Sequence, residues 1–348
     1  MTRTLSELIA PTQRVALVGL AKNTGKTETL AAILRELAEQ ETCVGVTSIG
    51  RDGEEHDVID ARIDKPRIVL RAGSLLASAD ALVRASGLAH ERLAQTGVRT
   101  PLGEVVIARI AEQGAVEVAG PSAAEDLRKV SDAMIGFGVE KVLIDGSIDR
   151  RAASSPAVAD GLVMATGAVL SEDIEEVVAA TKDAVDLVRL PTTGAAPADA
   201  PTDASDGGGE EHLTLERRLV LNAEPAEIAT LLREHPRAST FLIDGALGER
   251  FLEGLLAART ERAGRRLRIV VGDPTKAFLS RRGPDWYRRQ GIAIEVLQMI
   301  GLKAITVNPV APQSHRFDSG QLRALIEAAV ADVPVLDVLD PGYLALAK

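Results

Sequence analysis

Aromatic residues and cysteine are scarce in this chain of 348 residues, and both deficits limit what it can be. Only 2% of the residues are aromatic, so the core must consist mostly of Ala, Val, Leu and Ile. Cys43 is the single cysteine, which excludes an intrachain disulfide and a cysteine-based metal site. No stretch of about 18 apolar residues occurs, so we expect a cytoplasmic protein without a membrane partner.

Positive charge is also in deficit. The chain has 40 Lys and Arg against 50 Asp and Glu, a formal net charge of -10. Broad electrostatic attraction to nucleic acid is therefore not expected. Four arginines near Trp286 and Tyr287 are a local exception that could contact nucleic acid or a nucleotide. A solvated helix face that packs one Trp, or a contact with a partner, is the favoured interpretation.

What the sequence does contain is a glycine-rich segment, GLAKNTGKT, at residues 19–27. An apolar, strand-like run precedes it, and apolar residues at helical spacing follow it. This order predicts a phosphate-binding loop, in which Gly19 and Gly25 let backbone N–H groups point at phosphate oxygens. Lys26 would reach the outer phosphates and Thr27 would hold Mg²⁺, so we expect ATP, with GTP possible, and Mg²⁺ as cofactors. The predicted nucleotide-binding residues are Gly19, Lys22, Asn23, Thr24, Gly25, Lys26, Thr27, Thr29 and Asn308.

The loop is longer than the common form, because Leu20 occupies the usual position of the first glycine. Such a loop resembles that of dethiobiotin synthetase and its relatives among P-loop NTPases. Lys22 lies one position from where the signature lysine of the dimerising MinD-like ATPases falls. A contact with a phosphate across a homodimer and plain exposure to solvent are both open for Lys22, and exposure is favoured.

Three aspartates are candidates for binding the metal ion and for taking part in catalysis. Asp145 follows an apolar strand and enters a glycine turn, a pattern typical of the Walker B carboxylate beside Mg²⁺. Asp244 ends a similar segment, but Asp145 is preferred because it shares the linker-free half with the loop. Asp52 follows the strand expected at residues 44–49 and could hold Mg²⁺ through water or orient the attacking water. A solvated acidic turn explains Asp52 equally well. The predicted catalytic residues are Lys26, Asp145 and Asp52, and the predicted metal ligands are Thr27, Asp145 and Asp52.

Strands and helices alternate along the chain, which predicts an α/β fold with a mainly parallel sheet of the P-loop NTPase type. Residues 74–95 are expected to be helical. The segment 191–212 is rich in Pro, Gly, Ala and Asp and is expected to be a disordered linker. We therefore expect an NTPase domain at residues 1–190, and at 213–348 a second α/β domain or the completion of the NTPase sheet.

Asn308 follows a late strand and precedes Pro309. Its side chain can donate and accept at once, as recognition of a base requires. If this region belongs to the NTPase sheet, Asn308 is a candidate for reading the base.

Four segments resemble a family of P-loop proteins identified as the ATPase-like reactivase subunit of lysine 5,6-aminomutase. They are VGLAKNTGKT (18–27), TPLGEVVIARI (100–110), VLIDGSIDR (142–150) and VNPVAP (307–312). The resemblance implies a reactivating chaperone that works with a second reactivase subunit and uses ATP to help exchange damaged cobalamin on the aminomutase. It also implies that Lys26, Thr27 and Asp145 carry the nucleotide and Mg²⁺. No motif identifies a cobalamin ligand.

Two other functions fit the same loop. One is an ATP-dependent ligase like dethiobiotin synthetase, which would act on a small carboxylate or carbamate. The other is a nucleotide-gated interaction protein with negligible turnover.

Overall fold

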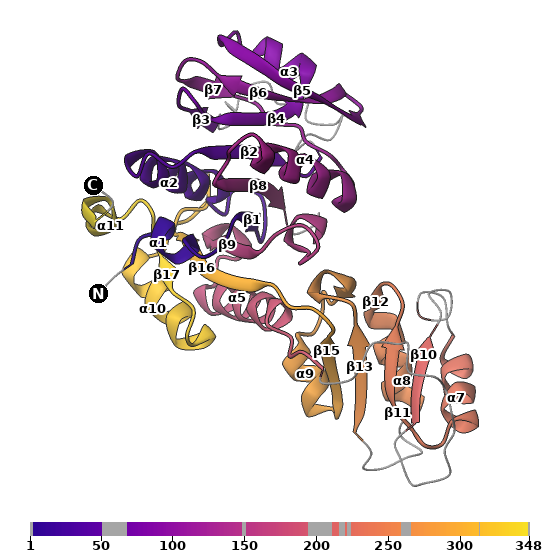
Figure 1. The fold of residues 1–348 in the computed structure, drawn as a ribbon. Helices are drawn as coiled ribbons and strands as arrows, with labels where there is room; N and C mark the ends of the chain where they lie inside the picture. The colour runs from indigo at the N-terminus through magenta and orange to yellow at the C-terminus, as the bar shows by residue number, and fades with distance from the viewer. Residues whose placement is uncertain are drawn as a thin grey trace. The chain divides into compact units, whose positions relative to one another are not determined.

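The computed structural model describes residues 3–50, 68–147, 151–193, 211–215, 220, 224–258, 266–312 and 314–346. The chain divides into two compact units (Figure 1). The first unit comprises Met1–Thr181 and Gly301–Lys348, and the second comprises Lys182–Ile300. Along the described ranges, every helix is too short or too polar to cross a membrane.

The first unit is built on a nine-stranded sheet, which is parallel except at one edge. The predicted fold class, a mainly parallel α/β sheet of the P-loop NTPase type with a second α/β part, is confirmed. In spatial order the strands are β17 (Val335–Leu336), β16 (Gly301–Asn308), β9 (Gly161–Gly167), β1 (Arg14–Gly19), β8 (Lys141–Ser147), β2 (Val44–Ser48), β4 (Leu75–Ala79), β6 (Gly103–Ile110) and β5 (His90–Thr100).

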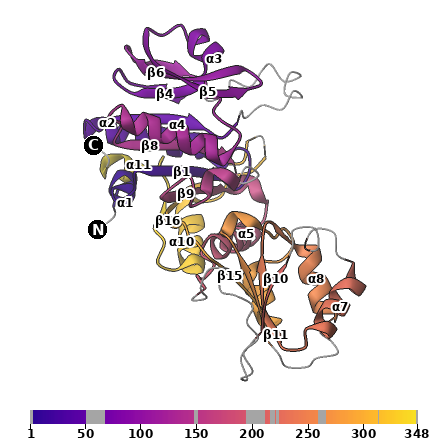
Figure 2. The ribbon, with the colours of Figure 1, turned by 45° about the vertical axis from the view of Figure 1, so that its right-hand side comes forward.

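Helices pack around this sheet, and α2 shows why. Leu30, Ile33 and Leu37 of α2 are buried, whereas Arg35 and Glu39 on its other side are exposed. The apolar stripe is therefore the surface that packs on the sheet. Figures 1 and 2 both show α2 and α4 beside β8. The helices that lie wholly in this unit are α1 (Leu5–Ile9), α2 (Lys26–Glu39), α3 (Asp80–Ala85), α4 (Ala124–Gly136), α10 (Ser319–Val330) and α11 (Pro341–Leu346); α5 (Ile174–Val188) begins in it.

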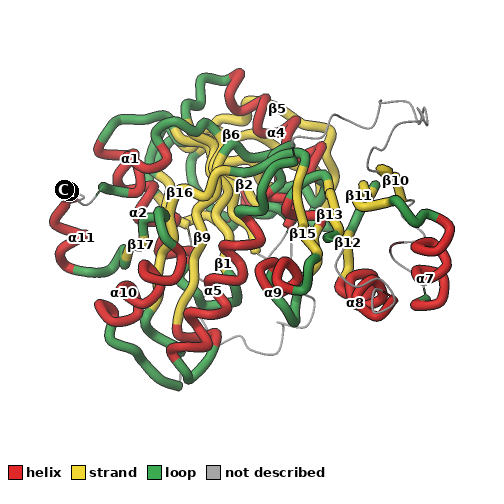
Figure 3. Tube along the Cα trace, turned by 90° about the horizontal axis from the view of Figure 1, so that it is seen from below, coloured by secondary structure: helices red, strands yellow, loops and turns green. Residues whose placement is uncertain are grey.

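The second unit has its own parallel sheet, with the strand order β10-β11-β13-β15. Because neighbouring strands follow the chain order, right-handed crossovers place the helices on one face. Figure 3 shows α7, α8 and α9 along one side of these strands. The elements are β10 (Glu211–Leu215), α7 (Pro225–Glu234), β11 (Ala238–Ile243), β12 (Leu247–Gly248), α8 (Glu249–Ala258), β13 (Leu267–Val271), β14 (Ala277–Phe278), α9 (Pro284–Arg289) and β15 (Ile292–Val296).

The division of the chain differs from the boundaries expected from composition. The chain leaves the first unit within α5 and returns to it at Gly301, where β16 pairs with β9. The second unit is therefore an insertion between two strands of the first sheet. Most of the expected linker, residues 194–210, lies outside the described residues.

The expected helix at residues 74–95 is wrong. The chain there forms β4, the short helix α3 and the beginning of β5. All five residues of β4 are buried. A strand buried on both faces has no polar alternation, so its apolar run cannot be told from a buried helix by periodicity.

Candidate functional site

The glycine-rich segment connects β1 to α2 at the carboxyl edge of the parallel strands. Every residue of β1 is buried, and the N–H of Leu20 donates to the carbonyl oxygen of Ala165 in β9 at 2.9 Å. Gly25 then caps α2 with φ 86°, a left-handed conformation that favours glycine. No described side chain caps this helix. The first-turn N–H groups of α2 are therefore not taken up by a capping side chain.

Both glycines of the loop lie where a side chain would not fit. A Cβ at Gly19 would lie 2.6 Å from the hydroxyl oxygen of Thr24. A Cβ at Gly25 would lie 3.0 Å from the Cβ of Asn308. Buried Thr24 in turn donates its hydroxyl to the carbonyl oxygen of Ala21 at 3.0 Å. The backbone thus forms a closed turn that only glycine permits at these two places.

Lys26 and Asp145 meet beside this turn. Lys26 begins α2, and Asp145 lies in β8, directly across from Leu17 of β1. The Nζ of Lys26 lies 3.1 Å from Oδ1 of Asp145, and their side chains are 15% and 18% exposed. The fold therefore brings together a lysine and a carboxylate that are 119 positions apart by their numbers, 145 minus 26.

Asn308 and Thr306 of β16 hold the loop from the other side. The Nδ2 of Asn308 donates to the carbonyl oxygen of Asn23 at 2.9 Å, and its Oδ1 accepts from the N–H of Val310 at 3.1 Å. The hydroxyls of Thr306 and Thr29 are 2.7 Å apart and buried. Asn23 has φ 63°, a conformation that is uncommon outside glycine. The contact from Asn308 therefore supports a strained residue of the loop.

This placement bears on the base-reading role that the sequence suggests for Asn308. Both polar atoms of its side chain are engaged in bonds within the protein. The geometry favours a role in positioning the loop. Sequence reasoning missed this role, and missed Thr306 entirely, because no local signal links β16 to a loop far upstream in the chain.

The remaining predicted residues are distributed differently. Thr27, in the first turn of α2, is partly buried, and Lys22 in the loop is exposed. Asp52 lies outside the described residues. Asp244 is exposed after β11 and belongs to the second unit, so Asp145 is the aspartate beside Lys26.

The site fits a phosphate group with a hard cation. Gly19 and Gly25 allow the tight turn, and a turn of this kind at a helix N-terminus can present backbone N–H groups to a phosphate. The Thr27 hydroxyl and the Asp145 carboxylate are oxygen donors of the kind that Mg²⁺ prefers. Among the described residues, no group of three or more His, Cys, Asp and Glu is arranged to hold a metal. Mg²⁺ does not need such a group, because it takes one or two protein ligands together with phosphate and water.

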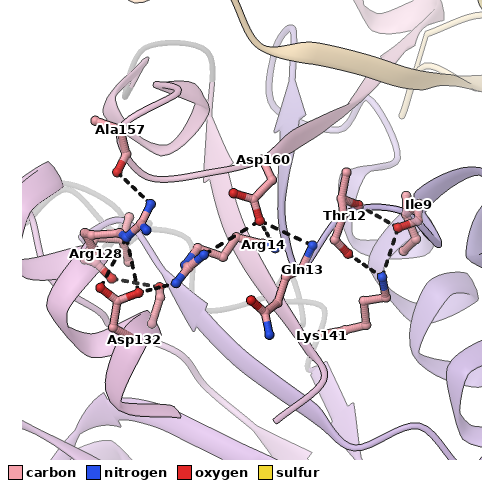
Figure 4. A network of polar contacts seen from close by, with 11 residues as sticks. Ile9, Thr12, Gln13, Arg14, Arg128, Asp132, Lys141, Ala157 and Asp160 are labelled. Atoms are coloured by element: carbon pink, nitrogen blue, oxygen red, sulfur yellow. Dashed lines mark hydrogen bonds and ion pairs between the residues drawn. The ribbon is translucent and has the colours of Figure 1, made fainter. Parts of the chain in front are cut away.

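A polar network fixes the same strands at their opposite ends (Figure 4). Arg14, at the start of β1, pairs with Asp132 of α4, and its N–H donates to Oδ2 of Asp160 at 2.8 Å. Lys141, at the start of β8, donates to three carbonyl oxygens at and after the end of α1, while burial lowers its pKa. These contacts tie the starts of β1 and β8 to neighbouring elements, at the ends of the strands opposite the glycine-rich loop.

Comparison with known proteins adds little to this geometry. No protein-family model and no curated protein matches the chain. One solved structure that matches is that of pNOB8 ParA bound to nonspecific DNA, with a TM-score of 0.27 and 14% sequence identity. The match covers 53% of this chain and 64% of that chain, less than two thirds of its length. This similarity is too low to carry a function over. The sheet and loop of this chain themselves show a mainly parallel α/β fold of the P-loop NTPase type.

Proposed function

We propose that the chain binds and hydrolyses a Mg²⁺-bound nucleoside triphosphate, with ATP as the nucleotide. The observation that carries the proposal is the 3.1 Å pair of Lys26 and Asp145 at the beginning of α2, beside the glycine turn. The turn and the helix N-terminus present N–H groups to an anion. Lys26 adds a positive charge at the place where the outer phosphates would lie.

Each residue has a separate role in this proposal. The N–H groups of the loop bind phosphate oxygens, and Lys26 stabilises the negative charge that develops during phosphoryl transfer. Thr27 and Asp145 would hold Mg²⁺, which when bound neutralises phosphate charge. Asn308 keeps the loop in its binding shape. Asp52, as a further metal ligand or as the residue that orients water, stays part of the proposal.

The metal part of the proposal is tested with Asp145→Asn, which keeps the size of the side chain and removes its charge. We expect Mg²⁺-dependent ATP hydrolysis to fall by at least about tenfold. Asp244→Asn is the matched control, because Asp244 ends a similar segment in the second unit. Equal loss in both variants, or hydrolysis that does not depend on Mg²⁺, would contradict the assignment.

We further propose that the hydrolysis cycle serves a partner enzyme, with the chain as the reactivating subunit of an adenosylcobalamin-dependent aminomutase. This finer proposal rests on the resemblance of the four segments given above. It is tested by incubating an inactivated aminomutase with this protein, its partner subunit and ATP. We expect activity to return only when ATP and intact Lys26 are both present. No recovery in the complete mixture would exclude the reactivase role while leaving nucleotide binding untouched.

Kinetics separate the two alternatives. A ligase like dethiobiotin synthetase would form ADP only when a small carboxylate or carbamate is added. A nucleotide-gated interaction protein would bind ATP tightly and release almost no ADP. GTP in place of ATP is tested by competition, and a homodimer that brings Lys22 to a partner's phosphate is tested by the oligomeric state with and without nucleotide.

A further inference from the structure

The second unit contains a cavity of about 490 Å³ that the nucleotide proposal does not use. Two arginines and two aromatic rings form most of its wall. Arg281 and Arg282 lie in the turn before α9, Trp286 and Tyr287 lie on α9, and Glu253 comes from α8. This volume lies within the range of small-molecule sites.

The charges around the cavity leave one arginine without a carboxylate. Arg281 pairs with Glu253 at 3.2 Å, and Arg288 and Arg289 both pair with Asp285. Within the described part of the chain, no carboxylate pairs with the guanidinium of Arg282. It lies instead over the ring of Trp286, 5.3 Å from its centroid. Among the described residues, Arg282 is therefore the arginine of the cavity wall whose guanidinium makes no ion pair with a carboxylate.

The turn that carries both arginines is held in a fixed shape. Oε1 of Glu249 accepts the N–H groups of Ser280, Arg281 and Arg282 at 2.9, 2.7 and 3.1 Å. Its Oε2 accepts the hydroxyl of Ser280 at 2.9 Å. Four hydrogen bonds on one carboxylate fix the backbone from which the arginines extend. Binding a ligand here would therefore cost little ordering of the backbone.

The aromatic part of the wall offers a flat surface and a hydroxyl. The rings of Trp286 and Tyr287 meet edge to face, with centroids 5.0 Å apart. Tyr287 is buried, and burial together with the nearby charges of Glu249 and Glu253 raises its pKa to about 12. Its hydroxyl therefore keeps its proton at neutral pH and can donate a hydrogen bond. Trp286 is only partly buried, with one side packed against the core and Arg282 over its ring, so its exposed part offers apolar contact to a ligand ring.

We propose that this cavity is a second binding site, for a small ligand that combines a flat ring with one anionic group and has about the size of a mononucleotide. The ring packs against Trp286, and the anion binds Arg282. One guanidinium without an ion pair and the chain's net charge of -10 disfavour a polyanionic strand, which needs many cations. The site lies entirely in the second unit and does not depend on the glycine loop.

The chain's only tryptophan makes the proposal directly measurable, because Trp286 itself lines the cavity. The full-length protein is titrated with AMP, which carries a ring and a phosphate but lacks the outer phosphates that Lys26 would bind. Adenosine and inorganic phosphate supply the two halves separately. Trp286 is excited at the red edge of its absorption band. Its emission is corrected for light absorbed by the base, which is measured with free N-acetyltryptophanamide. We expect a saturable change with AMP and a weaker one with either half.

Three variants localise the signal. Arg282→Ala should weaken AMP binding by about tenfold, the loss of one hydrogen bond to a charged group. Arg288→Ala removes the same charge from α9, but Arg288 is paired with Asp285 and does not line the cavity, so binding should be unchanged. Lys26→Ala should also leave the AMP response intact, even if it abolishes ATP binding.

Four results would overturn the second site. They are no saturable response to AMP, an equal response to adenosine or phosphate alone, equal affinity in Arg282→Ala, and loss of the response in Lys26→Ala. The last result would show that the signal comes from the glycine loop. A failure of ATP binding in the wild type would refute the proposed function and leave this site standing.

Discussion

Replacing Asn308 by alanine separates two explanations of one residue. In the structure the side chain of Asn308 donates a hydrogen bond to the carbonyl oxygen of Asn23, so the alanine variant should loosen the phosphate loop. A base-reading residue would instead change the preference among nucleotides. The two explanations therefore predict different patterns across ligands.

The size of the effect follows from the bond that is lost. A hydrogen bond between neutral groups contributes about 0.5–1.5 kcal/mol net, which corresponds to about a 2- to 10-fold change in affinity. The lost bond supports Asn23 at φ 63°, where a residue with a side chain is strained. The loop should therefore spend more time in shapes that do not bind phosphate. Affinity should fall by the same factor for every ligand that occupies the loop.

Calorimetric titration of wild type and Asn308→Ala with ATP, GTP and inorganic tripolyphosphate measures this pattern. We expect equal losses for all three, because the change acts on the phosphate cradle. Asn308→Asp should bind all three ligands still more weakly, because its carboxylate would face the carbonyl oxygen of Asn23. A loss confined to ATP, with tripolyphosphate binding unchanged, would refute loop positioning and restore the base-reading role.

Three further predictions concern single residues. In urea unfolding, Gly25→Ala should destabilise the first unit by about 1–2 kcal/mol, which is the cost of a left-handed conformation in a residue other than glycine. Gly136→Ala in α4 is the control and should cause no loss of stability, because a Cβ there meets nothing within 4 Å. Tyr343→Phe removes the hydroxyl that accepts from the N–H of Leu5 and donates to buried Glu36. The free energy of unfolding should therefore fall by about 2–3 kcal/mol. A fall of less than about 0.5 kcal/mol would contradict the burial of this network. Burial raises the pKa of Glu249, but its hydrogen bonds to the 280–282 turn lower the pKa by more, so it lies below the ordinary value of a glutamate. The stabilisation is therefore complete above the ordinary pKa of glutamate and is lost as the pH falls through the lowered pKa. Urea midpoints followed by Trp286 emission should therefore drop in acid, and less steeply in Glu249→Gln; equal slopes would contradict this.

Local patterns predicted the secondary structure around the glycine-rich loop. An apolar strand, a glycine turn and an amphipathic helix follow one another within 26 residues from Arg14 to Glu39, 39 minus 14 plus 1, so their sequence order alone indicates their geometry. Asp145 is preferred because its strand ends in an Asp-Gly turn and it shares the linker-free half with the loop. The sequence could not decide between Asp145 and Asp244, since that choice depends on which sheet each strand joins.

Long-range contacts escaped prediction. The pairing of β16 with β9, which places Asn308 against Gly25, brings together segments separated by the whole second unit. The insertion of that unit was invisible for the same reason, because strand order is set by packing and not by local propensity. The cluster around Trp286 was visible as arginines beside an aromatic ring. The sequence could not predict which of these arginines makes no ion pair with a carboxylate, because that depends on side-chain contacts set by the fold.

Nucleotide binding by wild type and Lys26→Ala tests the central claim most directly. Titration with ATP and Mg²⁺ should show affinity about 10- to 100-fold weaker in Lys26→Ala, because a charged contact with phosphate is lost. Lys129→Ala is the matched control, since Lys129 pairs with Glu125 on the surface of α4. Weaker binding in Lys26→Ala alone is the predicted result. Equal binding of ATP by all three proteins would contradict the assignment of the glycine turn as a phosphate-binding loop.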